Sequence, residues 1–220
     1  MPAVIFDMDG TLINSEDLWR RAEISCFAKA GVTLTEDDCK ETIGVRIDQV
    51  VEYWRERKIW VGISNQDLTR EIVDEVAQLF AAEPNLRDGA LELIEEFEKM
   101  GIPQAVASAS PQRLIDKNLE AVGIRNRFRL THSAEFEQRG KPDPAVFLTA
   151  AKRLGVEPAE CVVFEDSLNG IRAARAAGMT CIAIQEPATP FDQAQSLANY
   201  AIESFRGFRE TELFHTLFSA

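Results

Sequence analysis

Ala3-Val4-Ile5-Phe6-Asp7-Met8-Asp9-Gly10-Thr11, close to the start of the chain, is a short apolar run that ends in two acids and a glycine. Such a run is typical of a buried parallel strand. Ligands of open α/β sheets bind at the carboxyl ends of the strands, so Asp7 and Asp9 are expected to face a crevice. Two carboxylates at this place suit a nucleophile beside a proton donor, or a pair of Mg²⁺ ligands.

Three later segments carry polar groups in a comparable setting. Residues 102–108 form an apolar run that ends at Ser108, and residues 140–144 place Lys141 in a turn made rigid by prolines. Residues 161–165 predict a third strand, which ends in Glu165 and is followed at once by Asp166. Because parallel strands end at one edge of a sheet, the groups on the predicted strands are expected to meet there.

Taken in order, these four segments resemble the motifs of the haloacid dehalogenase-like (HAD) hydrolases, along nearly the whole chain. The resemblance implies a Rossmann-like parallel sheet core of the α/β class, with an α-helical cap inserted after the first motif. It makes Asp7 the nucleophile and Asp9 the general acid and base. Family members that cleave carbon–halogen or phosphonate bonds lack the second aspartate, so Asp9 points to phosphoryl chemistry.

Two other classes of site could contain an aspartate-rich turn. A calcium-binding EF-hand needs a preceding helix and a glycine at the sixth loop position, whereas Gly10 is fourth from Asp7 and follows a strand-like run. A phospho-acceptor module would also place an aspartate at a strand end, but it explains neither Asp9 nor the long insertion after it. A purely structural role for all four motifs together is the least favoured interpretation.

The insertion is identified by its hydrophobic spacing. Residues 16–83 carry helical patterns, with Leu68, Ile72, Val76, Leu79 and Phe80 on one face of a helix over 65–80. A segment of this length is too long for an ordinary βα loop. We therefore expect a core domain at 1–15 and 84–220 and a helical cap domain at 16–83. Beyond the cap, helices are expected at 88–100, 111–122, 144–154 and 168–177, and strands at 102–108, 128–131, 161–165 and 180–184.

Charge at the expected site calls for a cation. Asp7, Glu165 and Asp166 bring three negative charges and a phosphate brings nearly two more, against one positive charge on Lys141. Oxygen ligands without His or Cys favour Mg²⁺, with Asp7, Asp9, Asp166 and Glu165 as its candidate ligands and Glu165 acting directly or through a water.

Phosphate and sugar contacts are expected from four further residues. The Ser108 hydroxyl and the Ala109 amide precede a helix, where anions bind readily; the alternative is a simple helix cap. Lys141 would compensate charge on both the nucleophile and the phosphate. Arg46, in the cap, reaches a sugar hydroxyl or the phosphate in one interpretation and is a surface residue in the other.

The composition excludes several partners. A net charge of −12 argues against binding to nucleic acid or to an anionic membrane surface. Cys26, Cys39, Cys161 and Cys181 have no zinc-type spacing. No segment approaches the ~20 apolar residues of a membrane span, and no signal peptide is visible. We expect a monomeric cytoplasmic protein with a small phosphosugar as its partner.

Within the superfamily, the chain resembles the β-phosphoglucomutase-like group of sugar phosphatases. The matching residues include Ser15, Glu16, Trp19 and Gly44. Mutases of this group carry a His where Trp19 stands, and we expect Trp19 to pack in the cap core rather than to stack on a sugar. The prediction is a Mg²⁺-dependent phosphatase acting on hexose or hexitol phosphates through an aspartyl-phosphate. The alternatives are a phosphosugar mutase and a non-catalytic phosphate-binding module.

Overall fold

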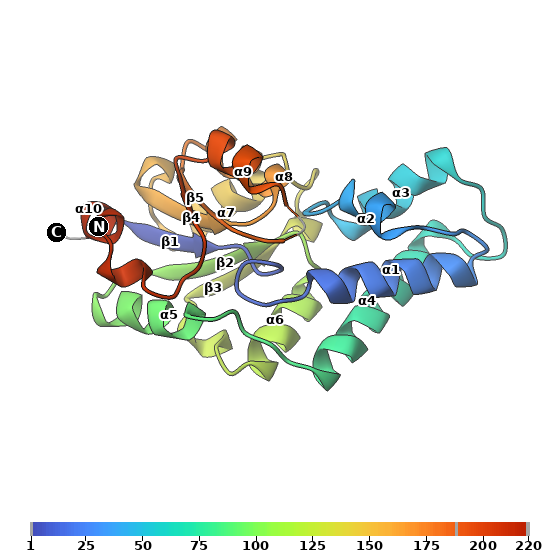
Figure 1. Ribbon diagram of the computed structural model, residues 1–220, viewed down its shortest axis with the longest axis horizontal. Coiled ribbons are helices and arrows are strands. Elements are labelled where there is room, and N and C mark those ends of the chain that lie inside the picture. The colour runs from blue at the N-terminus through green and yellow to red at the C-terminus, as the bar shows by residue number, and fades with distance from the viewer. Residues whose placement is uncertain (1, 188, 219–220) are drawn as a thin grey trace.

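A computed structural model of the protein describes residues 2–187 and 189–218. These residues form a six-stranded parallel sheet with the strand order β3-β2-β1-β4-β5-β6 (Figure 1). The strands are β1 (Ala3–Phe6), β2 (Gln104–Ser108), β3 (Leu130–Ser133), β4 (Cys161–Glu165), β5 (Thr180–Ile184) and β6 (Tyr200–Ile202). This topology confirms the predicted α/β class and the Rossmann-like core.

Side chains alternate between the two faces of the sheet, and each face has its own hydrophobic core. Val4 and Phe6 of β1 point into a cluster rich in phenylalanine, in which the Phe6 and Phe164 rings stack at 5.1 Å between centroids. Ala3 and Ile5 point into the opposite cluster, which is rich in alanine. Small side chains let the helices on that face lie close to the strands.

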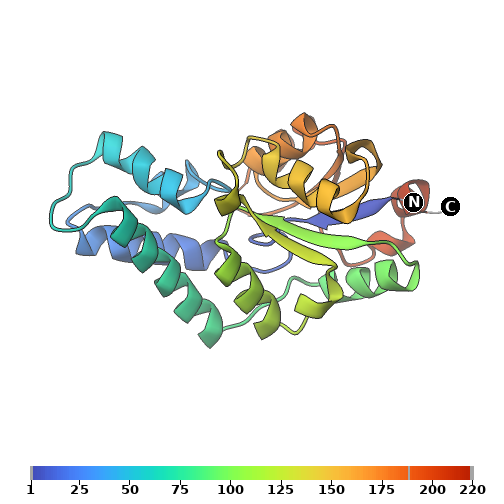
Figure 2. The same ribbon diagram turned by 180° about the vertical axis from the view of Figure 1, so that it is seen from behind.

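The helices cover both faces. On the phenylalanine-rich face lie α5 (Ala90–Lys99), α6 (Gln112–Ala121) and α10 (Glu212–Phe218), and on the other face lie α7 (Ala145–Leu154), α8 (Leu168–Ala176) and α9 (Phe191–Leu197) (Figures 1 and 2). Short 3₁₀ turns occupy Arg125–Arg127, Ala134–Phe136, Pro158–Glu160 and Phe208–Glu210. Most predicted elements appear within two residues of their expected ends. The strand expected at 128–131 is displaced to Leu130–Ser133, because the buried Phe128 enters the core before the ladder begins.

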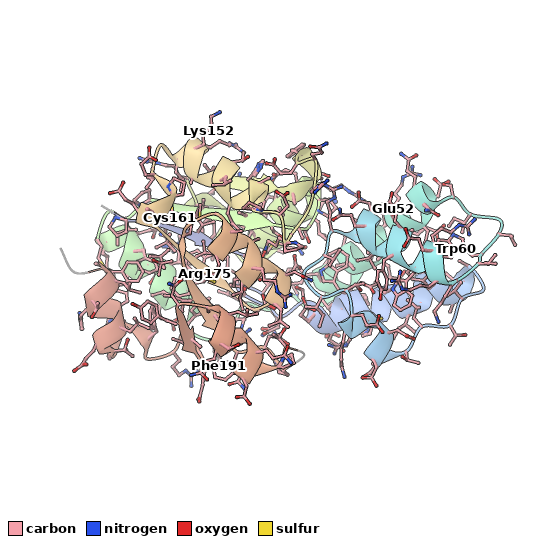
Figure 3. The ribbon with its side chains drawn as sticks, turned by 90° about the horizontal axis from the view of Figure 1, so that it is seen from above. Glu52, Trp60, Lys152, Cys161, Arg175 and Phe191 are labelled. Atoms are coloured by element: carbon pink, nitrogen blue, oxygen red, sulfur yellow. The ribbon has the colours of Figure 1, made fainter. Side chains whose placement is uncertain are left out.

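Helices between β1 and α5 form a separate bundle, which Figure 3 shows beside the sheet with Glu52 and Trp60 in it. They are α1 (Glu16–Lys29), α2 (Glu36–Lys40), α3 (Ile47–Arg57) and α4 (Asn65–Ala82). A third hydrophobic cluster, including Phe27, Trp54 and Ile72, lies among them. Leu114 of α6 belongs to this cluster, so the bundle also packs against the core. We call residues 16–83 the cap.

Two chain segments join the cap to the core, and they run side by side. Ile13 forms an antiparallel bridge with Leu86, and the Asn14 amide donates to the Asn85 carbonyl at 3.1 Å. The Arg87 amide donates to the Leu12 carbonyl at 2.8 Å. The two connections are thus fastened to each other at the base of the cap.

The strand order reverses between β1 and β4, and this is where the acids lie. Phe6 is paired with Phe164, so Asp7 and Glu165 come level at the carboxyl ends of adjacent strands. The Asp7 amide donates to the Phe164 carbonyl at 3.0 Å. A switch point of this kind is the usual ligand crevice of an open α/β sheet. Among the described residues, no helix combines the length and apolarity needed to cross a membrane.

Candidate active site

Asp7 and Lys141 form a buried ion pair at the end of β1. The Lys141 ammonium donates to Asp7 Oδ1 at 2.5 Å and to Glu165 Oε2 at 2.6 Å, and Lys141 is only 2% exposed. Burial raises the pKa of Asp7 well above its usual range, and Glu165 and Asp9 raise it further, while Lys141 opposes the shift. The pKa of Lys141 is raised because Asp7 and Glu165 outweigh its own burial.

Glu165 and Asp166 diverge, although they are neighbours in sequence. Glu165 Oε1 accepts from the Asp166 and Ser167 amides and from the Ser167 hydroxyl, and its other oxygen holds Lys141. Asp166 Oδ1 accepts from the Thr11 hydroxyl at 2.7 Å, but Asp166 Oδ2 is buried with no partner among the described residues. Glu165 is thus saturated with donors, whereas Asp166 has an oxygen to offer.

A glycine allows Asp166 to approach the first motif. Gly10 has a φ of +73°, and a Cβ there would meet Asp166 Oδ2 at 2.3 Å. Any side chain at this position would therefore displace the carboxylate. The glycine that ends the Asp7–Asp9 motif is needed for this close approach as well as for its backbone conformation.

The buried acids fit a hard divalent cation. Asp7, Glu165 and Asp166 each offer an oxygen, and these oxygens lie within 4.8 Å of one another. Burial and the neighbouring carboxylates Glu165, Glu16 and Asp7 raise the pKa of Asp166 well above its usual range. A cation placed here would relieve that repulsion. All-oxygen ligands and an unpartnered carboxylate oxygen suit Mg²⁺.

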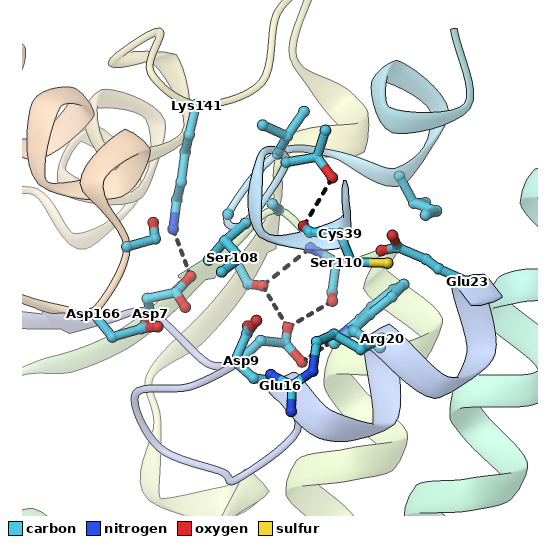
Figure 4. A pocket seen from close by; sticks show the side chains of 18 residues that line it. Asp7, Asp9, Glu16, Arg20, Glu23, Cys39, Ser108, Ser110, Lys141 and Asp166 are labelled. Carbon is cyan, nitrogen blue, oxygen red and sulfur yellow. Dashed lines mark hydrogen bonds and ion pairs between the residues drawn. The ribbon is translucent and has the colours of Figure 1, made fainter. Parts of the chain in front are cut away.

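Asp9 has a different surrounding, although it is only two residues from Asp7. Its Oδ1 accepts from the Ser15 hydroxyl at 2.7 Å and from the Trp19 indole at 2.9 Å. Its Oδ2 accepts from the Ser110 hydroxyl at 2.7 Å and from the Ser108 hydroxyl at 3.3 Å. Figure 4 shows this carboxylate turned away from the Asp7–Lys141 pair. The sequence predicts a metal ligand here, but the structure does not bring the Asp9 side chain into the three-acid cluster.

Ser108 and Ala109 line the same cavity as Asp7 and Asp9. Ser108 Oγ accepts from the Ser110 amide at 3.0 Å, which orders the turn after β2. The N-terminal capping residue of helix α6 is Pro111, which makes no side-chain hydrogen bond to the helix. The Gln112 amide donates to the Glu135 carboxylate at 2.8 Å. The helix-cap interpretation of Ser108 is therefore wrong, because α6 has no side-chain N-cap and the Ser108 hydroxyl donates to Asp9 instead.

The cavity lies between the core and the cap. Its cap-side wall includes Glu16, Trp19, Arg20 and Glu23 of α1 together with Cys39 and the loop 42–45 (Figure 4). Its volume is about 60 Å³, enough for roughly four to six waters at about 10–15 Å³ each. A phosphate ion fits such a space, with the cap lying over the strand ends that carry the acids.

Contacts from the loop 42–46 hold the cap against the core domain. The Asn169 side chain donates to the Ile43 carbonyl at 3.1 Å. Gly44, with a φ of +74°, lies so close to Ser167 that a Cβ would meet its Oγ at 2.3 Å. The bulk of any other residue here would push the cap away from the core.

Arg46 belongs to this closing contact rather than to the cavity wall. Its guanidinium donates to the Ala134 and Glu137 carbonyls of the core at 2.8 and 2.9 Å, and to both Asp48 oxygens. The sequence predicts contact with a sugar hydroxyl or the phosphate, or else a surface position. The structure gives neither: the side chain is mostly buried, and the donors that would bind substrate are engaged by backbone carbonyls of the core.

Sequence reasoning missed most of the α1 face that lines the cavity. Glu16, Trp19, Arg20 and Glu23 follow the three- and four-residue spacing of one helical face. That polar spacing could have identified them as a group. Trp19 packs against the cap core as predicted, but its indole nitrogen also binds Asp9, which the sequence did not show.

The chain is similar to known phosphatases over most of its length. Hexitol phosphatase B of Escherichia coli O157:H7 is 38% identical over 203 residues, which are 92% of this chain and 91% of that protein. The phosphorylated carbohydrates phosphatase of Thermotoga maritima is 31% identical over 179 residues, 81% of this chain and 82% of that one.

Solved structures share the fold as well. CbbY from Rhodobacter sphaeroides, in complex with phosphate, superposes with a TM-score of 0.83 at 30% identity, covering 93% of this chain and 95% of that one. The family profile of the haloacid dehalogenase-like hydrolases matches residues 1–178. With four motifs, the sheet order and this match in agreement, the chain belongs to the haloacid dehalogenase-like hydrolases.

Proposed function

We propose that this protein is a Mg²⁺-dependent phosphatase that hydrolyses phosphate monoesters of hexoses or hexitols. One observation carries the proposal: two aspartates, two residues apart, have different partners. Asp7 is paired with Lys141 within the three-acid cluster, while Asp9 lies outside that cluster and is held by hydroxyl and indole donors. Such a separation suits a nucleophile and a separate proton carrier.

In the proposed reaction, Asp7 attacks the phosphorus atom and the bond from phosphorus to the sugar oxygen breaks. Asp9 gives its proton to the departing oxygen, which leaves as an alcohol. Water then attacks the phosphorus of the aspartyl-phosphate, and Asp9 takes a proton from that water. Inorganic phosphate leaves and both aspartates return to their starting states.

Other residues bind and orient the phosphate. Lys141 neutralises charge on Asp7 and reaches a phosphate oxygen from the same place, while Glu165 positions Lys141. Ser108 and Ala109 offer donors from the cavity wall. Asp7 and Asp166 would hold Mg²⁺ directly, since the hydrogen bonds described above go to Oδ1 of each residue and leave Oδ2 for the cation. Bound there, the cation supplies positive charge that lets an anionic nucleophile approach an anionic ester.

The substrate class rests on the cap and on the relatives. A cap that closes over the strand ends excludes water from the departing group and contacts the part of the substrate beyond the phosphate. Relatives named for hexitol phosphate and for phosphorylated carbohydrates favour a phosphosugar or phosphopolyol. The division into a core at 1–15 and 84–220 and a cap at 16–83 is part of this proposal.

Trp19 argues for hydrolysis over phosphoryl transfer between sugar hydroxyls. A mutase has to return its phosphoryl group to a sugar and therefore needs a cap group with proton chemistry near Asp9. The indole of Trp19 donates a hydrogen bond to Asp9 but has no proton to exchange near neutral pH. A non-catalytic module would not need the Asp9 arrangement.

The test is phosphate release from a panel of phosphosugars and phosphopolyols with Mg²⁺ present. Wild-type protein should release phosphate from hexose or hexitol 6-phosphates, and Asp7→Asn should release at least about a thousandfold less, which corresponds to ~4 kcal/mol in the barrier. Asp88→Asn is the matched control, because Asp88 is exposed and pairs with Arg206 on the surface. Wild-type activity in Asp7→Asn would contradict a covalent role.

A further inference from the structure

Glu23 is a buried acid in the cap for which the proposed reaction has no use. It lies on α1, is 7% exposed and lines the cavity shared with Asp7 and Asp9. Its Oε2 has no hydrogen-bond partner among the described residues. A buried carboxylate oxygen without a partner is costly and is typical of a group that awaits a ligand.

The place of Glu23 relative to Asp9 defines what that ligand is. Trp19 contacts Asp9, and Glu23 follows four residues later on the same helix face, so its backbone lies about 6 Å farther along α1. In the proposed reaction, Asp9 lies next to the oxygen atom that joins the phosphate to the carbon chain of the substrate. Figure 4 shows Glu23 on the side of the cavity away from Asp7 and Lys141, so Glu23 would face the part of a substrate several carbons away from the phosphate.

The surroundings of Glu23 favour a neutral group over an anion. Cys39 and Glu16 are neighbours of Glu23 in the cavity wall, with Arg20 as the nearby cation. The Cys39 thiol interacts with the Glu23 carboxyl group. A second phosphate or a carboxylate placed here would meet acids, whereas hydroxyl groups can both donate to a carboxyl group and accept from it.

The protonation of Glu23 agrees with this. Burial raises its pKa to about 8, with Cys39 acting in the opposite direction. Near neutral pH the carboxyl group can therefore serve as a donor through one oxygen and as an acceptor through the other. A chain of hydroxyl groups offers both kinds of partner.

Resting on the function proposed above, we propose that Glu23 is a specificity-determining residue that binds hydroxyl groups on the carbon chain of the substrate. It would favour monophosphates of polyols over monophosphates whose carbon chain carries no hydroxyl groups. The residue binds substrate without taking part in the chemical step, so its removal should raise KM while kcat changes little.

Two variants test the hydrogen bonding of Glu23. Glu23→Leu removes all hydrogen bonding with little change in size, and Glu23→Gln keeps one donor group and one acceptor group. Glu52→Gln is the matched control, because Glu52 is exposed on α3, away from the cavity (Figure 3). Steady-state constants are measured with sorbitol 6-phosphate, with hexyl phosphate, which has the same carbon chain without the other hydroxyls, and with sorbitol 1,6-bisphosphate.

For Glu23→Leu we expect KM for sorbitol 6-phosphate to rise about tenfold or more, with kcat and the constants for hexyl phosphate within about twofold of wild type. For Glu23→Gln we expect a smaller loss on sorbitol 6-phosphate and an unchanged discrimination against the bisphosphate, because the Glu23 carboxyl group that it replaces is protonated near neutral pH. If Glu23→Leu does not fold, as judged by circular dichroism, the Glu23→Gln comparison decides alone.

Equal losses on sorbitol 6-phosphate and hexyl phosphate, or no loss on either, would overturn the role of Glu23 while leaving phosphatase activity intact. A gain of Glu23→Gln on the bisphosphate would show that Glu23 is ionised in the complex and would overturn its role as a hydrogen-bond donor. Absence of wild-type turnover on every phosphopolyol and phosphosugar would instead overturn the proposed function, and the role of Glu23 with it.

Discussion

The indole nitrogen of Trp19 donates a hydrogen bond to Asp9 Oδ1 at 2.9 Å. Trp19 lies on the first helix of the cap, whereas the other oxygen of Asp9 is bound by Ser110 and Ser108 of the core. The carboxylate is thus held between cap and core. The orientation of the Asp9 carboxylate therefore depends on the position of the cap, and in the proposed reaction Trp19 would couple proton transfer by Asp9 to that position.

Trp19→Phe should lower kcat about three- to tenfold on every substrate, because one net hydrogen bond of about 1 kcal/mol that orients Asp9 is lost while the ring is kept. The measurement is steady-state phosphate release. Trp60→Phe is the matched control, since the buried Trp60 indole nitrogen has no partner among the described residues. Equal activities of wild type and Trp19→Phe would show that the indole bond does not orient the acid.

Asp166→Asn should abolish the stabilisation of the fold by Mg²⁺. Wild-type protein should melt at a higher temperature with millimolar Mg²⁺ than with EDTA, because an ion that binds only the folded state stabilises it. In EDTA the variant should melt above wild type, since it lacks a buried carboxylate whose pKa burial and Glu165 raise. Differential scanning fluorimetry measures both. An equal Mg²⁺-induced rise in melting temperature in the two proteins would show that Asp166 is not a metal ligand.

Wild-type phosphate release should also stop in EDTA and return with Mg²⁺.

Glu23→Gln should change how stability depends on pH. Between pH 4.5 and about 8 the folded wild type keeps a proton on Glu23 that the unfolded chain loses, so this group makes stability fall as pH rises. Gln has no such penalty. The variant should match wild type near pH 4.5 and exceed its free energy of unfolding by about 2–5 kcal/mol at pH 8.5, at ~1.4 kcal/mol per pKa unit.

Urea titrations in EDTA at these two pH values measure the difference. The exposed Glu52→Gln should follow wild type at both. A constant offset between Glu23→Gln and wild type at the two pH values would mean that the carboxyl group ionises as readily in the folded state as in the unfolded one.

Arg46→Ala should lower kcat/KM by a similar factor, about three- to tenfold, on all substrates, including p-nitrophenyl phosphate. The reason is that Arg46 fastens the cap to the Ala134 and Glu137 carbonyls and does not line the cavity. Arg70→Ala is the control, because Arg70 is an exposed cap residue paired with Asp67 on its own helix. A changed ranking of hexose and hexitol phosphates, with p-nitrophenyl phosphate unaffected, would return Arg46 to the specificity surface.

Local patterns in the sequence identified the elements that carry the acids. Strands at Cys161–Glu165 and Thr180–Ile184 begin and end at the predicted residues, because continuous apolar runs bounded by polar residues mark buried parallel strands. The sequence patterns did not predict the short or half-exposed elements. The edge strand Tyr200–Ile202 has three residues, and Glu36–Lys40 is a five-residue helix fixed by a capping box at Thr35. Neither is long enough to show a period.

Contacts between segments that are distant in the sequence could not be predicted either. Arg46 lies 88 residues from Ala134, and no spacing rule connects a cap arginine to a core carbonyl. The identity of Asp9 as a site residue could be read from the strand end, but its four donors come from two sides of a cavity that exists only after folding. The same holds for Glu23, whose sequence neighbours give no sign that its carboxyl group is buried.

The fate of the phosphoryl group tests the central claim, that this site delivers phosphate to water. Wild-type protein with Mg²⁺ is given glucose 6-phosphate and β-glucose 1-phosphate with a trace of glucose 1,6-bisphosphate, and ³¹P NMR follows all phosphorus species. Inorganic phosphate should grow with no conversion of β-glucose 1-phosphate to glucose 6-phosphate. Accumulation of glucose 6-phosphate faster than inorganic phosphate would contradict the hydrolase and establish a mutase in its place.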